Sequence, residues 1–253
     1  MFLRSDRYRF FYKETPKCGS TTLIHRILRM HGIEPWMNPR RFLRKHSSSL
    51  ASHGLKYGSL RGKSDSFFAD LNRSYFTFSV VRNPYARTLS NYHNKLNRYA
   101  AKYAKRAYLA GKLKQLLAGP SAWSRANVAS KHIAQHLSFA DFVRGLSRHG
   151  LRFDSHYWTL CDLLQPHQIN YDFILKLETI DHDLELLDQH LTGLGVNPVG
   201  NRASQQLNQS VALMAEPFSD RATQNLVHQL YQDDFARFNY APHYSVGSLA
   251  AVA

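Results

Sequence analysis

The chain is poor in several residue types, and each shortage excludes a class of protein. Only two cysteines occur among 253 residues, Cys18 and Cys161, which excludes a disulfide framework and a cysteine metal cluster. No apolar run approaches the ~20 residues that cross a bilayer. The first ten residues contain no hydrophobic region of a signal peptide, so we expect a cytoplasmic protein.

Acidic residues are also scarce. The chain has 18 Asp and Glu against 33 Lys and Arg, which gives a formal net charge of +15. This balance favours an anionic partner: a nucleic acid, a polyanionic sugar, a phosphorylated cofactor or a membrane surface. The length and the hydrophobic content of 43% suit one large α/β domain or two small ones.

The segment from Tyr8 to Leu28 predicts a strand, a polar loop and a helix. Aromatic residues at 8–12 form a β-like run, and the loop reads P-K-C-G-S-T-T. Apolar residues then recur at helical spacing: Leu23, Ile24, Ile27 and Leu28. A helix start presents unpaired N–H groups and a partial positive charge, so this geometry is typical of a phosphate site.

The loop residues suit an anion. Gly19 permits close backbone approach, Lys17 supplies a cation, and Ser20, Thr21 and Thr22 supply hydroxyl groups. An ordinary Ser/Thr-capped helix is the alternative. The loop is not a Walker A motif, because Lys17 precedes the only glycine. A single phosphate fits it better than a β/γ-phosphate pair.

A second strand–loop–helix pattern follows later in the chain. Its strand is expected at Tyr75–Val81, its loop at Arg82-Asn83, and its helix from Pro84 onward. Arg82 stands at the carboxyl end of the expected strand, where open parallel sheets bind ligands. Its guanidinium can grip a phosphate, and Ser90 two turns later can add a contact. The alternative is an arginine paired with a carboxylate. Two such sites together indicate a ligand with two separate phosphates.

The remaining pattern alternates strands and helices. We expect a strand at Tyr171–Glu178 and helices from Ser138, at Thr179–Leu194 and at Asp220–Phe238, with basic excursions at 34–65 and 96–131. This order predicts an α/β fold: a single domain with a central, mainly parallel sheet flanked by helices.

These motifs resemble a known family. T-P-K-C-G-S-T-T is similar to the 5′-phosphosulfate loop of sulfotransferases that use 3′-phosphoadenosine 5′-phosphosulfate (PAPS). V-V-R-N-P-Y-A-R-T-L-S-N-Y-H-N-K-L is similar to their 3′-phosphate motif. The longer form of this second motif resembles the carbohydrate sulfotransferases of the chondroitin/dermatan 4-O and HNK-1 group. Three further stretches resemble the same group: F-D-S-H-Y-W-T-L-C, N-Y-D-F-I-L-K-L-E-T-I-D-H-D and L-Y-Q-D-D-F-A-R-F-N-Y.

The resemblance implies a P-loop-like sulfotransferase fold over residues 1–253, with PAPS as sulfuryl donor and no metal. It implies that Arg82 and Ser90 hold the 3′-phosphate. The residues that would hold the 5′-phosphosulfate are Pro16, Lys17, Cys18, Gly19, Ser20, Thr21 and Thr22. The chain lacks the membrane anchor and the cysteine pattern of the family's Golgi members, so we expect a soluble, bacterial relative.

The implied chemistry is in-line sulfuryl transfer to a sugar hydroxyl. Lys17 would stabilise charge on the leaving phosphate. The base that takes the hydroxyl proton stays open among His53, His156 and Glu14, and we expect Cys18 to be packed. The basic segments favour an acidic glycan as acceptor.

Two other functions remain open. A P-loop-like nucleotide kinase shares the strand–loop–helix but needs a Walker A loop and a Mg²⁺-holding aspartate, and neither is evident. A non-enzymatic polyanion-binding protein explains the charge but not the two phosphate loops. We expect no nucleic-acid partner, and peripheral contact with a membrane stays open.

Overall fold

The computed structural model describes residues 1–103, 138–197, 218 and 220–244, with the side chains of 95–103 outside the description. The chain divides into two compact units, which are taken separately below. Unit 1 contains Met1–Asn83 and the segment from Leu160, and unit 2 contains Pro84–Thr159 and the segment from Ala212. The prediction of a single domain therefore stays a prediction.

Unit 1 is built on a five-stranded sheet in the order β3-β1-β2-β4-β5. The strands are β1 (Phe2–Ser5), β2 (Phe10–Lys13), β3 (Leu55–Gly58), β4 (Phe76–Val81) and β5 (Phe173–Lys176). The β2–β4 and β4–β5 pairs are parallel, and their carboxyl ends meet at one edge of the sheet. This confirms the α/β architecture with a sheet flanked by helices.

The antiparallel half of the sheet corrects the expectation of a mainly parallel one. Strand β1 pairs antiparallel with both β2 and β3, so two of the four pairings are antiparallel. Both strands have only four residues, and each carries a cation, Arg4 on β1 and Lys56 on β3. Strands this short and polar leave little hydrophobic periodicity to find in a sequence.

The basic excursion at 34–65 also contains more regular structure than its sequence indicates. It forms α2 (Pro39–Lys45), the 3₁₀ helix η1 (Ser49–His53) and β3. Asn38 caps α2 by accepting the N–H of Arg41, and Pro39 occupies the first turn. Each element buries a single leucine: Leu43, Leu50 and Leu55.

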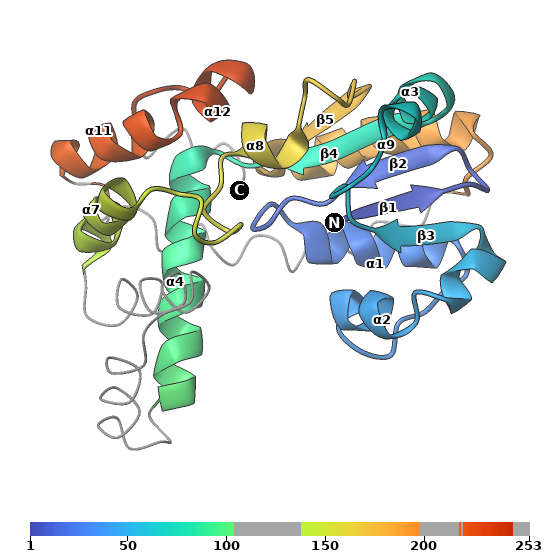
Figure 1. Ribbon diagram of the computed structural model, residues 1–253, viewed down its shortest axis with the longest axis horizontal. Coiled ribbons are helices and arrows are strands. Elements are labelled where there is room, and N and C mark those ends of the chain that lie inside the picture. Colours follow the sequence, from blue (N-terminus) through green and yellow to red (C-terminus); the bar gives the residue numbers. More distant parts are fainter. Residues whose placement is uncertain (104–137, 198–217, 219, 245–253) are drawn as a thin grey trace. The chain divides into compact units, whose positions relative to one another are not determined.

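Helices cover both faces of the sheet, with α1 (Ser20–Met30) and α3 (Asp65–Ser74) on opposite sides (Figure 1). Phe2 and Phe11 pack with Phe68 and Leu71 of α3. On the other face, α9 (Ile180–Gly193) is tied to α1 by an ion pair between Arg26 and Asp188. Two further short elements of the described part of this unit are α8 (Leu160–Leu164) and the 3₁₀ helix η2 (Leu177–Thr179).

Unit 2 is helical in its described part. Its helices are α4 (Pro84–Tyr103), α7 (Phe139–His149), α11 (Arg221–Leu230) and α12 (Gln232–Arg237). Helices α4, α7 and α11 contact one another. Their shared core is aromatic, with Tyr85 against Phe218 and Phe235, and Phe142 against Tyr157. The basic excursion expected at 96–131 lies outside the described residues beyond Tyr103.

Candidate functional site

The loop between β2 and α1 is held in shape by its own hydroxyl groups. Thr15 Oγ1 donates a hydrogen bond to the carbonyl of Val80 on β4, and Ser20 Oγ donates to the carbonyl of Thr15. Both side chains are buried. Ser79 Oγ on β4 donates to the carbonyl of Lys13 at 2.7 Å. The neighbouring strand β4 therefore fixes the course of the loop.

The sequence predicts that the Ser20 hydroxyl contacts an anion, and this contact stays a prediction. In the structure the Ser20 side chain is buried, and its hydroxyl donates to the carbonyl of Thr15. Cys18 is fully buried, as expected for a packed thiol, with Sγ 3.5 Å from the carbonyl of Pro16. Thr21 is exposed and Thr22 is half-buried. Thr21 is thus the exposed hydroxyl residue of the loop, and Lys17 is half-buried like Thr22.

Two residues of the loop have left-handed backbone conformations. Lys17 has φ 68° and Gly19, which precedes α1, has φ 73°. A side chain at such a φ costs about 1–2 kcal/mol, so the surrounding bonds must hold Lys17 in place. The first turn of α1 has no acidic residue and no side-chain cap from Gly19. Its N–H groups and helix dipole therefore favour an anion.

Arg82 brings the two sequence motifs together. Its Nη1 donates a hydrogen bond to the carbonyl of Lys17 at 3.3 Å, and the residue is only 7% exposed. The guanidinium is a planar fork of five N–H donors, the geometry that suits phosphate oxygens. The carboxyl ends of β2 and β4 thus place Arg82 beside the loop, as the sequence predicted.

Glu178 also lies at this site, although the sequence analysis gave it no role. Its Oε1 accepts a hydrogen bond from the backbone N–H of Asn83 at 2.8 Å. Glu178 lies in η2, directly after β5, so the third parallel strand supplies a carboxylate beside Arg82. The sequence could have indicated Glu178, because it is the last residue of the strand predicted at Tyr171–Glu178 and so belongs to the same edge of the sheet.

Ser90 lies on α4 in unit 2 and is half-buried. Pro84 opens this helix as expected, and Thr88 Oγ1 donates to the carbonyl of Pro84 at 2.7 Å. The contact of Ser90 with a 3′-phosphate stays a prediction.

The structure places His53 at the other end of the sheet from the loop. Strand β3 begins two residues after His53, beside Ser5 of β1 and therefore level with Phe10, where β2 begins. The loop follows Lys13, at the far end of β2, so roughly 10 Å of strand separates the two places. His53 is exposed there. The structure does not bring this candidate base to the loop.

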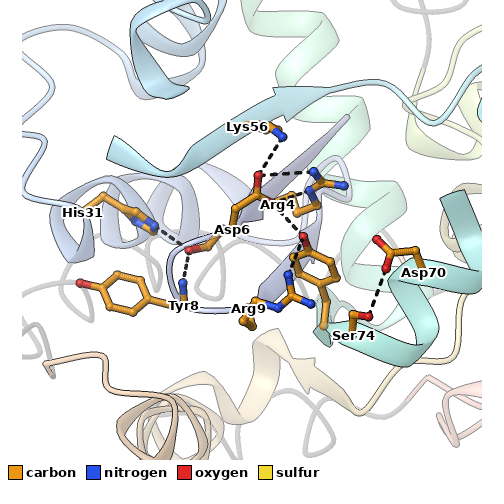
Figure 2. A network of polar contacts seen from close by, with 10 residues as sticks. Arg4, Asp6, Tyr8, Arg9, His31, Lys56, Asp70 and Ser74 are labelled. Atoms are coloured by element: carbon orange, nitrogen blue, oxygen red, sulfur yellow. Dashed lines mark hydrogen bonds and ion pairs between the residues drawn. The ribbon is translucent and has the colours of Figure 1, made fainter. Parts of the chain in front are cut away.

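A polar network lies at this end of the sheet, where the Asp6 N–H donates to the carbonyl of Gly54 at 2.8 Å. Figure 2 shows the side chains of the network. Asp6 pairs with Arg4 and Lys56, each at 2.8 Å, and accepts the Tyr75 hydroxyl at 2.9 Å. Burial raises the pKa of Asp6, but these partners outweigh it and hold the pKa below its usual value. The network joins β1, β3 and the end of α3, so its role is structural.

Glu14 does lie at the loop, but its carboxylate is engaged. Its Oε1 is 2.5 Å from Nε of Arg40 on α2, and only 11% of the Glu14 side chain is exposed. Tyr57 on β3 belongs to the same group, because burial and then the charge of Glu14 raise its pKa while Arg44 and Arg40 oppose them. Helix α2 therefore brings two arginines toward the end of β2 that carries the loop.

His156, in unit 2, has a carboxylate partner. Asp154 Oδ1 accepts both the backbone N–H of His156, at 2.9 Å, and its ring Nδ1–H, at 2.8 Å. On the other side of the residue, the His156 carbonyl accepts Arg87 Nη2 at 3.2 Å and Asn91 Nδ2 at 2.8 Å. The sequence analysis assigns no role to Asp154, Arg87 or Asn91, which the structure brings into contact with His156.

The described residues contain no group of three or more His, Cys, Asp or Glu that could hold a metal ion. Among these same residues, no helix is long and apolar enough to cross a membrane.

The fold and the loops define an α/β protein with two candidate anion sites at the carboxyl ends of adjacent parallel strands. The chain belongs to the Sulfotransferase family, whose sequence profile matches residues 1–241. This match confirms the family resemblance carried by the motifs.

Curated relatives are carbohydrate sulfotransferases. Human carbohydrate sulfotransferase 14 is 29% identical over 199 residues, covering 72% of this chain and 44% of that protein. Human carbohydrate sulfotransferase 9 is 24% identical over 247 residues, covering 93% and 52%. Mouse carbohydrate sulfotransferase 12 is 24% identical over 252 residues, covering 93% and 58%. The chain thus spans about half the length of these relatives, and no solved structure matches it.

Proposed function

We propose that the chain transfers a sulfuryl group from PAPS to a hydroxyl group of a carbohydrate, within one P-loop-like sulfotransferase domain. The observation that carries this proposal is the hydrogen bond from Arg82 to the carbonyl of Lys17. It joins the residue expected to bind a 3′-phosphate to the loop expected to bind a 5′-phosphosulfate. Family membership and relatives that are named carbohydrate sulfotransferases support the same reaction.

The residues of unit 1 fit the donor. The left-handed Gly19 and the uncapped first turn of α1 offer backbone N–H groups to the 5′-phosphosulfate. Arg82, largely withdrawn from water, offers its fork to the 3′-phosphate. PAPS, when bound, supplies the sulfuryl group and leaves as adenosine 3′,5′-bisphosphate. Lys17 would stabilise the negative charge that grows on the departing phosphate.

Nucleotide binding tests the donor. We expect adenosine 3′,5′-bisphosphate to bind without Mg²⁺, and ATP to bind much more weakly with or without it. Calorimetry with both nucleotides decides between the functions, and a thermal shift should accompany binding, since a ligand at 100 times its Kd stabilises a protein by about 2.7 kcal/mol. Tighter ATP binding that requires Mg²⁺ would favour a nucleotide kinase. Binding of neither nucleotide would favour a polyanion-binding protein.

The acceptor that we propose is an acidic glycan. The net charge of +15 supports this choice, as do the arginines that α2 brings to the end of β2. The test compares sulfuryl transfer to desulfated chondroitin, dermatan and a neutral galactosaminide at low and high salt. We expect transfer to the acidic chains to be preferred and to weaken steeply with salt, because screening shortens the range of the attraction. Equal, salt-insensitive use of the neutral sugar would contradict an acidic acceptor.

A further inference from the structure

We infer that one surface of α2, together with the indole of Trp36, binds the chain of the acidic glycan acceptor, an inference that rests on the proposed function. The surface lies in unit 1, as does the loop between β2 and α1. Trp36 is 73% exposed, more than any other large hydrophobic side chain in the described part of the chain. Tryptophan is enriched at binding interfaces, because its ring offers a large apolar area beside one hydrogen-bond donor.

The indole of Trp36 is packed against the carboxyl end of α2. Its ring meets the ring of His46 edge to face, with the ring centroids 6.0 Å apart, and the rings of His46 and Phe42 are 4.7 Å apart. Phe42 and His46 are four residues apart and therefore share one stripe of the helix. The three rings form an aromatic flank of α2, so binding need not order a free indole.

The adjoining surface of α2 is cationic. At 3.6 residues per turn, Arg41 and Lys45 lie opposite the buried Leu43, and Arg44 lies between the two sides. All three cations are exposed, and none has a carboxylate partner among the described residues. The sequence from 35 to 64 contains no acidic residue. This face therefore attracts carboxylate and sulfate groups.

The other end of α2 reaches the loop. Arg40 Nε, in the first turn of α2, is 2.5 Å from Oε1 of Glu14, the residue directly before Thr15 of the loop. Arg40 and His46 are six positions apart, which corresponds to about 9 Å of helix. A glycan with its reacting sugar at the loop can therefore lay its next sugars along α2 and place one of them against Trp36.

The two kinds of contact match an acidic glycan. The C–H face of a sugar ring stacks on an aromatic ring, and the arginine fork suits carboxylate and sulfate groups. A single-stranded nucleic acid also combines flat rings with anions. The position of α2 beside the loop favours the glycan, because the acceptor has to reach the sulfuryl group that the loop is proposed to hold.

Direct binding tests the surface without turnover, with a hexasaccharide of desulfated chondroitin as the probe. We expect Trp36→Ala to weaken its binding by about tenfold, as for an aromatic anchor of an interface. The triple variant R41A/R44A/K45A should also lose about tenfold at low salt, and little at high salt. Tryptophan emission should shift to shorter wavelength when the wild type binds, and Trp36→Phe should lack this shift.

Matched controls come from exposed residues of the same unit. Leu194→Ala removes an apolar side chain that is 39% exposed, and Arg73→Ala removes a cation that is 81% exposed on α3. Both should bind the hexasaccharide like the wild type. Trp36→Phe should keep more affinity than Trp36→Ala, because a smaller aromatic ring remains.

Kinetics should report the same surface through chain length. Trp36→Ala should raise KM for the hexasaccharide more than KM for a disaccharide, because only the longer chain reaches the indole. Calorimetric affinity for adenosine 3′,5′-bisphosphate should stay near wild type. Unchanged hexasaccharide affinity in Trp36→Ala and in the triple variant would overturn the inference, as would tighter, Trp36-dependent binding of oligothymidylate. A wild type that binds the hexasaccharide through Trp36 but releases no bisphosphate from PAPS would instead overturn the proposed function.

Discussion

At the scale of single residues, the proposed donor site depends on side chains that belong to one sequence motif and contact another. Arg82 follows β4 but bonds the loop that follows β2, and Glu178 follows β5 but bonds the backbone beside Arg82. The residue types and the strand ends could be predicted from the sequence. The contacts could not, because the order of the strands in the sheet decides which ends are neighbours.

The first residue-scale prediction concerns Arg82→Ala. It should weaken binding of adenosine 3′,5′-bisphosphate by about 2–5 kcal/mol, as for a desolvated charge pair that loses one partner. Calorimetry measures the change. Arg73→Ala is the control, because the Arg73 side chain is 81% exposed and lies on α3. Equal affinity of Arg82→Ala and wild type would place the 3′-phosphate elsewhere.

At the scale of elements, helix ends were easier to predict than short strands. The pair His31-Gly32 predicts the end of the first helix, because glycine favours the left-handed conformation that often follows a helix. Helix α1 does end at Met30, and the Gly32 N–H donates to the carbonyl of Arg29. Ser138 caps α7 through the N–H of Asp141, also as predicted. Such signals are local in sequence. Strands β1 and β3 pair with each other, although they lie about 50 residues apart in the sequence. The local sequence of a four-residue strand does not reveal such a distant partner, so these two strands could not be predicted.

Substitutions at two glycines can test whether the loop before α1 binds the nucleotide. Gly19 and Gly32 have nearly the same backbone conformation, φ 73° and 71°, at the start and end of α1. Either one replaced by alanine should lower the free energy of unfolding by about 1–2 kcal/mol, because a left-handed residue with a Cβ is strained. A Cβ at Gly32 meets nothing within 4 Å, so strain is its whole cost.

The two variants should differ in ligand binding. Only Gly19→Ala should also weaken binding of adenosine 3′,5′-bisphosphate, since Gly19 borders the proposed phosphosulfate site. Denaturant unfolding and calorimetry measure the two effects. A loss of affinity in Gly32→Ala equal to that in Gly19→Ala would mean that the loop is not the binding element.

At the scale of the whole molecule, stability should depend on pH through a buried histidine. His31 donates from Nδ1 to the carbonyl of Ile27 at 2.8 Å, and its Nε2 lies 2.9 Å from Ser5 Oγ. Burial lowers the pKa of His31 below 6.5, with the bond to Ile27 opposing and the nearby charges of Arg7 and His53 adding to the decrease.

The sign of this dependence follows from linkage. As the pH falls below about 6.5, the unfolded chain binds a proton at His31 before the folded chain does, so the free energy of unfolding decreases until the folded pKa is passed. Denaturant titrations from pH 7.5 to 4.5 should show a flatter profile for His31→Gln than for wild type. His167→Gln, at an exposed histidine, should keep the wild-type slope. Parallel profiles for wild type and His31→Gln would contradict this assignment.

The hydrogen bonds of Thr15 and Ser20 have a consequence for the kinetics of nucleotide capture. Because both hydroxyl groups are bonded within the protein, the ordering of the loop is part of folding rather than of binding. Association with the nucleotide should then be a single fast step without a slow rearrangement, and most differences between nucleotides should arise in their dissociation rates.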